Sequence, residues 1–249
     1  MKKMILSLAI CIGLSTITFA QGTTLEKGQP SGSGAAKSAA GPVDLARATL
    51  NAHGGEKLRV IKTLVIRGSV DVTSSAINQP LAGGFAMIFS GDKYRLDLTT
   101  SVQSLSQVFD GVNTQTSVQG GFELPPINRI GFIMLAKVGD VNFPISALPD
   151  AKKKNGFRIT SPEGFYTDYL VDEKTGQLKG YESSYDFNGR VATTSVEIDK
   201  CRLVEGVLIP EKFSQRFDLG PLTAYANFKA KDIQVNAEIS NDVFTLRKQ

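Results

Sequence analysis

The chain has 249 residues, with 28 Lys and Arg against 24 Asp and Glu, one histidine, two cysteines, fourteen phenylalanines and no tryptophan. The first 20 residues hold two lysines and no acid, so the rest is nearly neutral, and its densest basic run is the three lysines at 152–154. Charge this sparse and mixed argues against nucleic-acid partners.

The N-terminus has the features of a secretory signal peptide. A basic tip at residues 2–3 precedes an apolar stretch over 4–14, and the small residues Thr18 and Ala20 fit the rule for cleavage after Ala20. A membrane anchor is the weaker alternative, because spanning a bilayer takes about 20 apolar residues. Lipidation at Cys11 is weaker still, because the residue before it is bulkier than such sites prefer. We expect residues 1–20 to be removed and the protein to act outside the cytoplasm.

Residues 21–41 are rich in Gly, Ser, Ala, Thr and Lys, with Leu25 as the one large apolar residue. A segment this poor in apolar surface is expected to be a flexible linker. Residues 42–249 are long enough to bury a core as one domain. Once Cys11 has left with the signal, Cys201 has no partner for an intramolecular disulfide, and we expect it to be a half-buried strand residue.

The first structured element is predicted to be a helix that begins at Pro42 and stops at Gly54-Gly55, since proline suits a first turn and glycine a helix end. One more short turn is expected over residues 56–61. The buried face of the helix is expected to hold Leu45, Ala46, Thr49, Leu50 and His53.

From residue 62 apolar and polar residues alternate, which predicts strands with one wet face. Asn188-Gly189 predicts a two-residue hairpin turn within 185–194, because both positions tolerate positive φ. The fold class is therefore mainly β with α, and about ten antiparallel strands would have to curl into a barrel, a part-barrel or a sandwich. The predicted strands are 62–72, 85–89, 94–98, 105–109, 157–160, 166–171, 178–185, 191–198, 213–217 and 222–233.

Residues 126–139 break the alternation and predict a second helix, entered through Pro126 and left at Gly139. Apolar residues lie on more than one side of it, so another part of the chain must cover it.

No catalytic constellation stands out. His53 lacks a histidine partner for a metal and a nucleophile to activate, and we expect it to cap the first helix. The Ser90-x-x-Lys93 string falls on a predicted strand, turn and strand rather than on the helix that this chemistry needs. The acids Asp97, Asp168 and Glu182 are scattered along the chain. We therefore expect no enzyme activity, no metal and no cofactor, with a carboxylate hydrolase kept as a third alternative.

Several strings, taken in order, resemble the LolA/LolB-like superfamily of periplasmic lipoprotein carriers and lipid-binding proteins. Residues 52–58, 61–64 and 67–68 resemble its entry helix and first strand, residues 204–210 its Gly-Val-x-Ile/Leu-Pro turn, and residues 233–244 its ending. The resemblance spans residues 43–246. It implies a LolA-like fold in the periplasm, an antiparallel, curved half-barrel sheet of about ten strands wrapped around helices, whose concave apolar face holds acyl chains.

The leading expectation is a monomeric, non-enzymatic binder or carrier of lipid or lipoprotein acyl chains that exchanges its ligand with membrane-associated donor or acceptor proteins. The first alternative is an envelope structural or sensing module that uses the same fold to bind protein, in which the apolar residues form a filled core. The residues expected to line the apolar cleft are Leu64, Ile66, Phe85, Met87, Phe89, Leu96, Leu98, Ile130, Ile133, Met134 and Leu135.

Overall fold

The structure is a computed structural model, and it describes residues 41–74, 79–117, 124–150, 155–187, 190–219 and 222–246. Four features expected from the sequence lie outside these residues: the signal peptide, the linker up to residue 40, the lysine run at 152–154 and the Asn188-Gly189 turn itself.

The expected first helix is present as α1 (Pro42–Ala52), with Pro42 in its first turn. It ends because Gly54 and Gly55 take positive φ angles of 117° and 56°, which glycine adopts without steric cost. The next turn, α2 (Glu56–Arg59), is also as expected. The face predicted to be buried is buried at Ala46, Thr49, Leu50 and His53, while Leu45 is partly buried and packs against the same core.

All ten expected strands are present, and two short strands, β5 and β6, add to them at the sheet edges. The strands are β1 (Thr63–Ser74), β2 (Leu81–Ser90), β3 (Lys93–Thr100), β4 (Ser104–Phe109), β5 (Thr114–Thr116), β6 (Ile145–Ser146), β7 (Gly156–Thr160), β8 (Tyr166–Val171), β9 (Leu178–Phe187), β10 (Arg190–Val204), β11 (Val207–Leu219) and β12 (Leu222–Val235).

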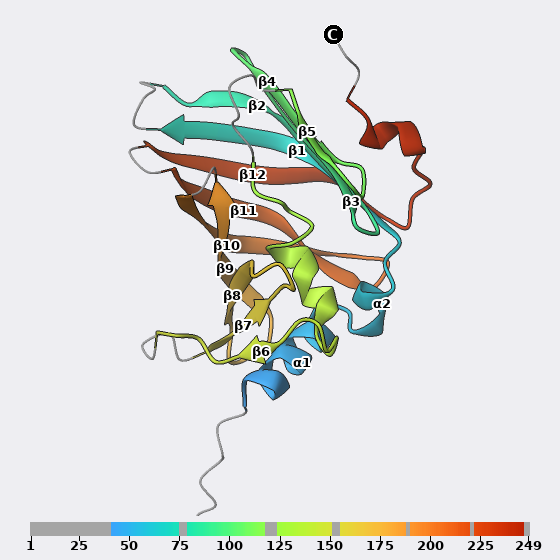
Figure 1. Cartoon of the computed structure of the whole chain (residues 1–249), viewed down its shortest axis with the longest axis vertical. Helices are drawn as coiled ribbons and strands as arrows, with labels where there is room; N and C mark the ends of the chain where they lie inside the picture. Colours follow the sequence, from blue (N-terminus) through green and yellow to red (C-terminus); the bar gives the residue numbers. More distant parts are fainter. Residues whose placement is uncertain are drawn as a thin grey trace, which may run out of the picture. The chain divides into compact units, whose positions relative to one another are not determined.

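The strands form one antiparallel sheet in the order β5-β4-β3-β2-β1-β12-β11-β10-β9-β8-β7-β6. The first long strand therefore pairs with the last, and every other pairing joins neighbours in the chain. Figure 1 shows the sheet bending between β12 and β7, with α1 and the segment before β6 on its inner side. Because β5 and β6 are not paired with each other, the sheet is a curved half-barrel and not a closed barrel.

The hairpin predicted around Asn188-Gly189 is supported by the register, in which Phe187 of β9 lies opposite Arg190 of β10. Only two residues connect these partners, as a two-residue turn requires. The strand, turn and strand expected for the Ser90-x-x-Lys93 string are also confirmed, with Ser90 opposite Lys93 in the β2–β3 pairing.

The prediction of a helix over residues 126–139 is wrong in length and type. Residues 127–131 form turns, and only η1 (Phe132–Lys137) is helical, as a 3₁₀ helix. Gly131 takes a φ of +79°, which interrupts the right-handed helical path before η1 starts. The apolar pattern reflects instead a segment enclosed by the sheet and α1, with Phe132, Met134 and Leu135 buried.

The sheet buries side chains on both faces of its first strands. The inner face carries the main core, which joins β1, β2, β7–β12, α1 and η1. On the outer face, Val65, Ile88 and Val108 pack against Phe244 of the C-terminal turn η2 (Asn241–Phe244). The expectation of one wet face therefore fails for β1, β2 and β4, because the C-terminal segment covers part of it.

Candidate functional site

The inner face of the sheet contains two adjoining apolar cavities. The first, named the η1 cavity, has a volume of about 70 Å³ and lies beneath the segment 125–133. It is lined by Leu64, Ile66, Met87, Phe89, Pro125, Ile127, Ile130, Gly131, Phe132, Ile133, Tyr181, Thr194, Pro210, Phe213 and Gln215.

The second, named the β12 cavity, has a volume of about 160 Å³. It is lined by Val72, Met87, Leu96, Leu98, Leu105, Leu124, Pro125, Ile127, Tyr185, Gln215, Phe217, Ala224, Tyr225, Ala226 and Phe228. Met87, Pro125, Ile127 and Gln215 border both cavities, so we treat the two together as one apolar trough.

The trough exists because small side chains of β12 face large ones on the neighbouring strands. Ala226 lies between Val72 of β1 and Gln215 of β11 in the register, and Ala224 lies opposite Phe217. Larger residues further along this face pack against each other. Phe213 and Phe228, for example, stack with ring centroids 4.8 Å apart. A dry cavity of about 150 Å³ with aliphatic and aromatic walls is known to bind benzene, so the β12 cavity has the size and character to hold an apolar group.

The loop over the trough is fixed to the sheet at Gly131. The Gly131 N–H donates to Thr167 Oγ1 at 3.0 Å, and the Tyr169 hydroxyl donates to the Gly131 carbonyl at 2.7 Å. Thr167 and Tyr169 are buried on β8. Both backbone groups of the left-handed glycine are therefore satisfied inside the protein, which holds Ile127, Ile130 and Ile133 over the trough.

A second anchor lies at the other end of this loop. Gln107 of β4 accepts a hydrogen bond from the Leu124 N–H at 2.6 Å and donates to the Leu124 carbonyl at 2.9 Å and to the Tyr94 hydroxyl at 2.7 Å. Gln107 is 1 % exposed, so these bonds are shielded from water.

Most of the cleft residues expected from the sequence lie at the trough. Leu64, Ile66, Phe89, Ile130 and Ile133 line the η1 cavity, Leu96 and Leu98 line the β12 cavity, and Met87 lines both. The other three are core residues that border neither cavity: Phe85, which packs edge-to-face on Phe228 at 5.0 Å, Met134 and Leu135.

Sequence reasoning missed the walls from β9 to β12 and the polar pair within them. Gln215 Nε2 donates to Thr194 Oγ1 at 2.8 Å, and Thr194 Oγ1 donates to the Arg216 carbonyl at 3.0 Å. These polar groups are satisfied by each other and by backbone. A signal that could have pointed to them is the pair of small residues Ala224 and Ala226 beside Phe228 on the inward face of β12.

A third space, named the polar cavity, adjoins the β12 cavity and has a volume of about 310 Å³. Leu124 and Tyr185 border both cavities. Its polar lining includes Asn128, Arg129 and Glu163, with Arg129 Nε 3.3 Å from Glu163 Oε1. Asn128 Nδ2 donates to the Asp92 carbonyl at 2.8 Å.

His53 is a structural residue and not part of the trough. Its Nδ1–H donates to the Leu208 carbonyl at 2.7 Å, and its Nε2 accepts from the Leu178 N–H at 3.0 Å. His53 stands at the C-cap of α1, as expected, and its backbone N–H bonds the last carbonyls of the helix. Its ring, however, joins α1 to the starts of β9 and β11. Burial lowers the pKa of His53, so the neutral tautomer that fits both bonds is favoured.

The carboxylates named in the sequence are bound to neighbouring groups. Asp168 is held by Arg158 through two hydrogen bonds of 2.6 and 2.8 Å, and Asp97 by Arg95 at 2.7 Å and Ser106 Oγ at 2.6 Å. The Lys93 ammonium is 3.4 Å from Asn241 Oδ1. Within the described residues, no group of three His, Cys, Asp or Glu is placed to hold a metal ion.

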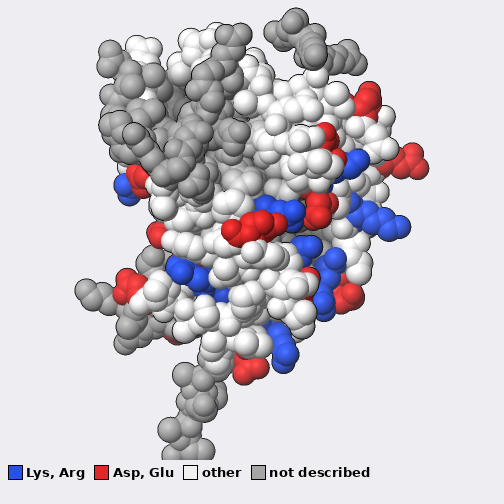
Figure 2. All heavy atoms as spheres, viewed as in Figure 1, with Lys and Arg blue, Asp and Glu red and all other residues white. Residues whose placement is uncertain are grey.

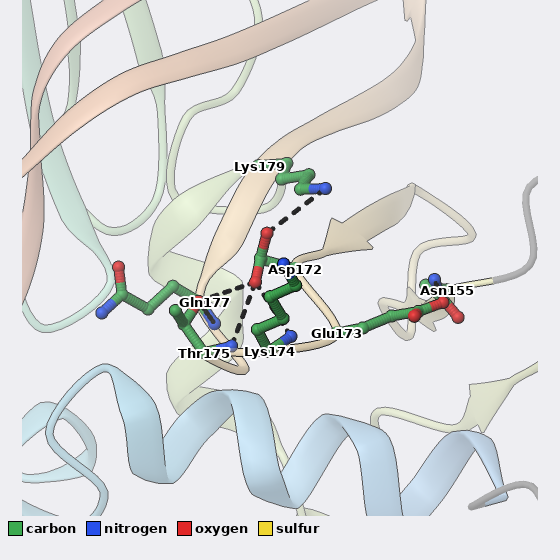
Figure 3. Close-up of polar contacts among 7 residues, drawn as sticks. All are labelled: Asn155, Asp172, Glu173, Lys174, Thr175, Gln177 and Lys179. Atoms are coloured by element: carbon green, nitrogen blue, oxygen red, sulfur yellow. Dashed lines mark hydrogen bonds and ion pairs between the residues drawn. The ribbon is translucent and has the colours of Figure 1, made fainter.

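Asp172 closes the turn between β8 and β9, where it gathers several polar contacts (Figure 3). Its Oδ1 accepts from the N–H groups of Lys174 and Thr175, and its Oδ2 lies 3.3 Å from Lys179 Nζ. These bonds lower the pKa of Asp172 to about 2. Aspartate commonly stabilises turns in this way, so the cluster is a turn motif.

Charged side chains show no single-sign patch on the face drawn in Figure 2, where basic and acidic groups alternate in a band. In the part of the chain that the structure describes, no helix is long and apolar enough to cross a membrane.

No family model and no curated protein matches the chain. Among solved structures, a DUF1329 family protein from Desulfovibrio piger has a TM-score of 0.46 and 8% identity over 83% of this chain and 98% of its own. A putative outer membrane lipoprotein-sorting protein domain from Vibrio parahaemolyticus has a TM-score of 0.42 and 10% identity over 80% of this chain and 97% of its own.

Proposed function

We propose that this protein binds the acyl chain of a lipid or lipoprotein in the apolar trough and carries it, without chemical reaction, across an aqueous compartment outside the cytoplasm. The observation that supports this most is the pair of adjoining cavities under the loop 124–133. The lipoprotein-sorting resemblance of the sequence and its signal-like N-terminus agree with an exported, periplasmic carrier that works as a monomer.

The energetics of an acyl chain suit such a trough. Removing one CH₂ group from water is worth about 0.8 kcal/mol, so about ten methylenes give roughly 8 kcal/mol before the cost of association. The cost of association reduces this gain, so the net affinity is weaker than the micromolar Kd that about 8 kcal/mol alone would give, which permits both capture and release. Because apolar burial is not directional, transfer needs only an acceptor whose site is more apolar.

The loop provides a route for exchange. Ile127, Ile130 and Ile133 cover the η1 cavity from a segment held at Gly131 and Leu124. Between these anchors the loop is also held by polar contacts of Asn128 and Arg129 with Asp92 and Glu163. Local opening between two fixed points would expose the trough while the sheet stays folded.

An envelope module that binds protein through the same fold predicts a filled core at this place. The cavities beneath the loop favour the lipid binder over that alternative.

The test is extraction of the natively purified, full-length mature protein with organic solvent, followed by mass spectrometry. We expect one class of amphiphile in near-stoichiometric amount, and we expect the delipidated protein to bind an uncharged apolar fluorophore that a fatty acyl compound displaces. The proposal would be refuted if no amphiphile co-purified and the delipidated protein did not bind the fluorophore.

A further inference from the structure

The polar cavity continues the trough at the end where apolar walls give way to hydrogen-bonding groups. Leu124 and Tyr185 form the shared boundary between it and the β12 cavity. The lining changes there from aliphatic side chains to Asn128, Arg129 and Glu163. A molecule that spans this boundary is apolar at one end and polar at the other.

Tyr185, at this boundary, differs from other buried tyrosines in the hydrogen bonds of its hydroxyl. Among the described residues, the hydroxyls of the buried tyrosines Tyr94 and Tyr169 are paired, with Gln107 and the Gly131 carbonyl respectively. Tyr185 is 4 % exposed and borders both cavities, and within the same described residues no hydrogen bond to its hydroxyl is seen. This hydroxyl is not one of the side-chain atoms that are fully buried without a partner in the described part of the chain, so it is open to the cavities that Tyr185 lines and can donate to a ligand there.

The charges lining the polar cavity cancel. Arg129 Nε lies 3.3 Å from Glu163 Oε1, and Arg129 also lies 3.6 Å from Asp92 Oδ1. An anionic headgroup would meet Glu163 and a cationic one would meet Arg129, and either would have to compete with an existing ion pair. An uncharged head that offers hydroxyl, ester or amide groups meets no such penalty.

We propose that the polar cavity binds the uncharged head of an acyl ester or amide whose chain lies in the apolar trough, with the Tyr185 hydroxyl donating a hydrogen bond to the carbonyl where head and chain join. This inference rests on the proposed function and specifies its ligand class. Asn128, Arg129 and Glu163 then face the hydroxyl or amide groups beyond the carbonyl.

The test compares three ligands of equal chain length on delipidated full-length mature protein: monopalmitoylglycerol, palmitate and hexadecyltrimethylammonium, each displacing N-phenyl-1-naphthylamine. The uncharged ester should displace this fluorophore at the lowest concentration. In Tyr185→Phe the ester should bind about 2- to 10-fold more weakly, as expected for one hydrogen bond, while the affinity for the fluorophore is unchanged.

The matched control is Tyr166→Phe, which removes a tyrosine hydroxyl on β8 that donates to Ser184 Oγ at 2.9 Å and that borders none of the three cavities. It should leave all three displacements unchanged. Without ligand, Tyr185→Phe should unfold at about the same temperature as wild type, because the hydroxyl that it removes bonds no described group of the protein.

The outcomes separate the two proposals. If the fluorophore does not bind to wild-type protein, both fail. If it binds, but palmitate displaces it as well as the ester does and Tyr185→Phe leaves ester binding unchanged, the headgroup site is refuted and the acyl trough stands. Loss of thermal stability in ligand-free Tyr185→Phe would also overturn the assignment, because it would mean that the hydroxyl has a structural partner.

Discussion

Filling the β12 cavity from within gives a quantitative test of whether the trough is open space. Ala226 of β12 is 3 % exposed and lines this cavity, which has a volume of about 160 Å³. In Ala226→Leu, three added carbons gain about 2.4 kcal/mol if they enter the cavity, at about 0.8 kcal/mol each. Ordering the longer side chain costs about 0.5–1 kcal/mol. The net stabilisation is therefore about 1.5 kcal/mol.

The control is Ala230→Leu, four residues further along β12 on the same face. Ala230 is 1 % exposed and borders none of the three cavities, because it packs opposite Gly68 of β1 in the main core. Added carbons there have no space to enter, and overpacking costs about 1–3 kcal/mol. The two substitutions are chemically identical, so the sign of their effects reports on the cavity alone.

The assay is thermal unfolding of the delipidated proteins together with binding of the apolar fluorophore. At about 2–4 °C per kcal/mol for a domain of this size, Ala226→Leu should raise Tm by about 3–6 °C and weaken fluorophore binding, while Ala230→Leu should lower Tm. If both substitutions destabilise the protein to the same extent, the space beside Ala226 is packed and the reasoning is refuted.

Three further predictions concern Gly131, which fixes the loop over the trough, and His53, which joins α1 to the sheet. Gly131→Ala should destabilise the protein by about 1–3 kcal/mol and weaken fluorophore binding, because alanine resists a φ of +79° and its Cβ would lie 3.2 Å from the Tyr181 ring. Urea unfolding measures the stability and fluorophore titration measures the affinity. Wild-type values in both would contradict the role given to Gly131. His53→Ala should cost about 2–5 kcal/mol, because it leaves two buried backbone groups without a partner, and retained stability would contradict the bridging role. Since burial lowers the pKa of His53 in the folded state, the unfolded chain takes up the proton first as pH falls below about 6.5, so wild-type stability should drop there and level off below the folded pKa. His53→Ala should lack this part of the pH dependence in urea unfolding between pH 5 and 8.

The fold was largely predictable because each long strand repeats its alternation over enough residues to be recognised. The two unpredicted strands, β5 and β6, have three and two residues, too few to show a period. The helix over 126–139 was wrong because the apolar spacing does not reveal that Gly131 turns left-handed. The outer face of β1 and β2 was predicted to be wet because the sequence does not show that Phe244, far along the chain, returns to cover it.

The candidate site was predictable only in part, for a physical reason. Alternation shows which residues point inward, and so it found Leu64, Met87 and Leu98, among others. Whether an inward residue packs or borders a void depends on the size of its neighbours on other strands. Phe85 packs against Phe228, whereas Met87 borders the space left by small residues of β12. The unpaired hydroxyl of Tyr185 depends on three-dimensional contacts and had no signal in the sequence.

The methionines allow the most direct measurement of ligand position. The chain has four, and removal of residues 1–20 leaves Met87, which borders both parts of the trough, and Met134, which is 1 % exposed and borders neither. A mature protein labelled with ¹³C at the methionine methyl groups should therefore show two methyl signals. With a bound acyl ester, we predict intermolecular nuclear Overhauser effects from the acyl chain to the Met87 methyl and none to that of Met134. Contacts to neither methyl, or to Met134 alone, in a complex shown to be saturated would contradict binding of the acyl chain in the trough.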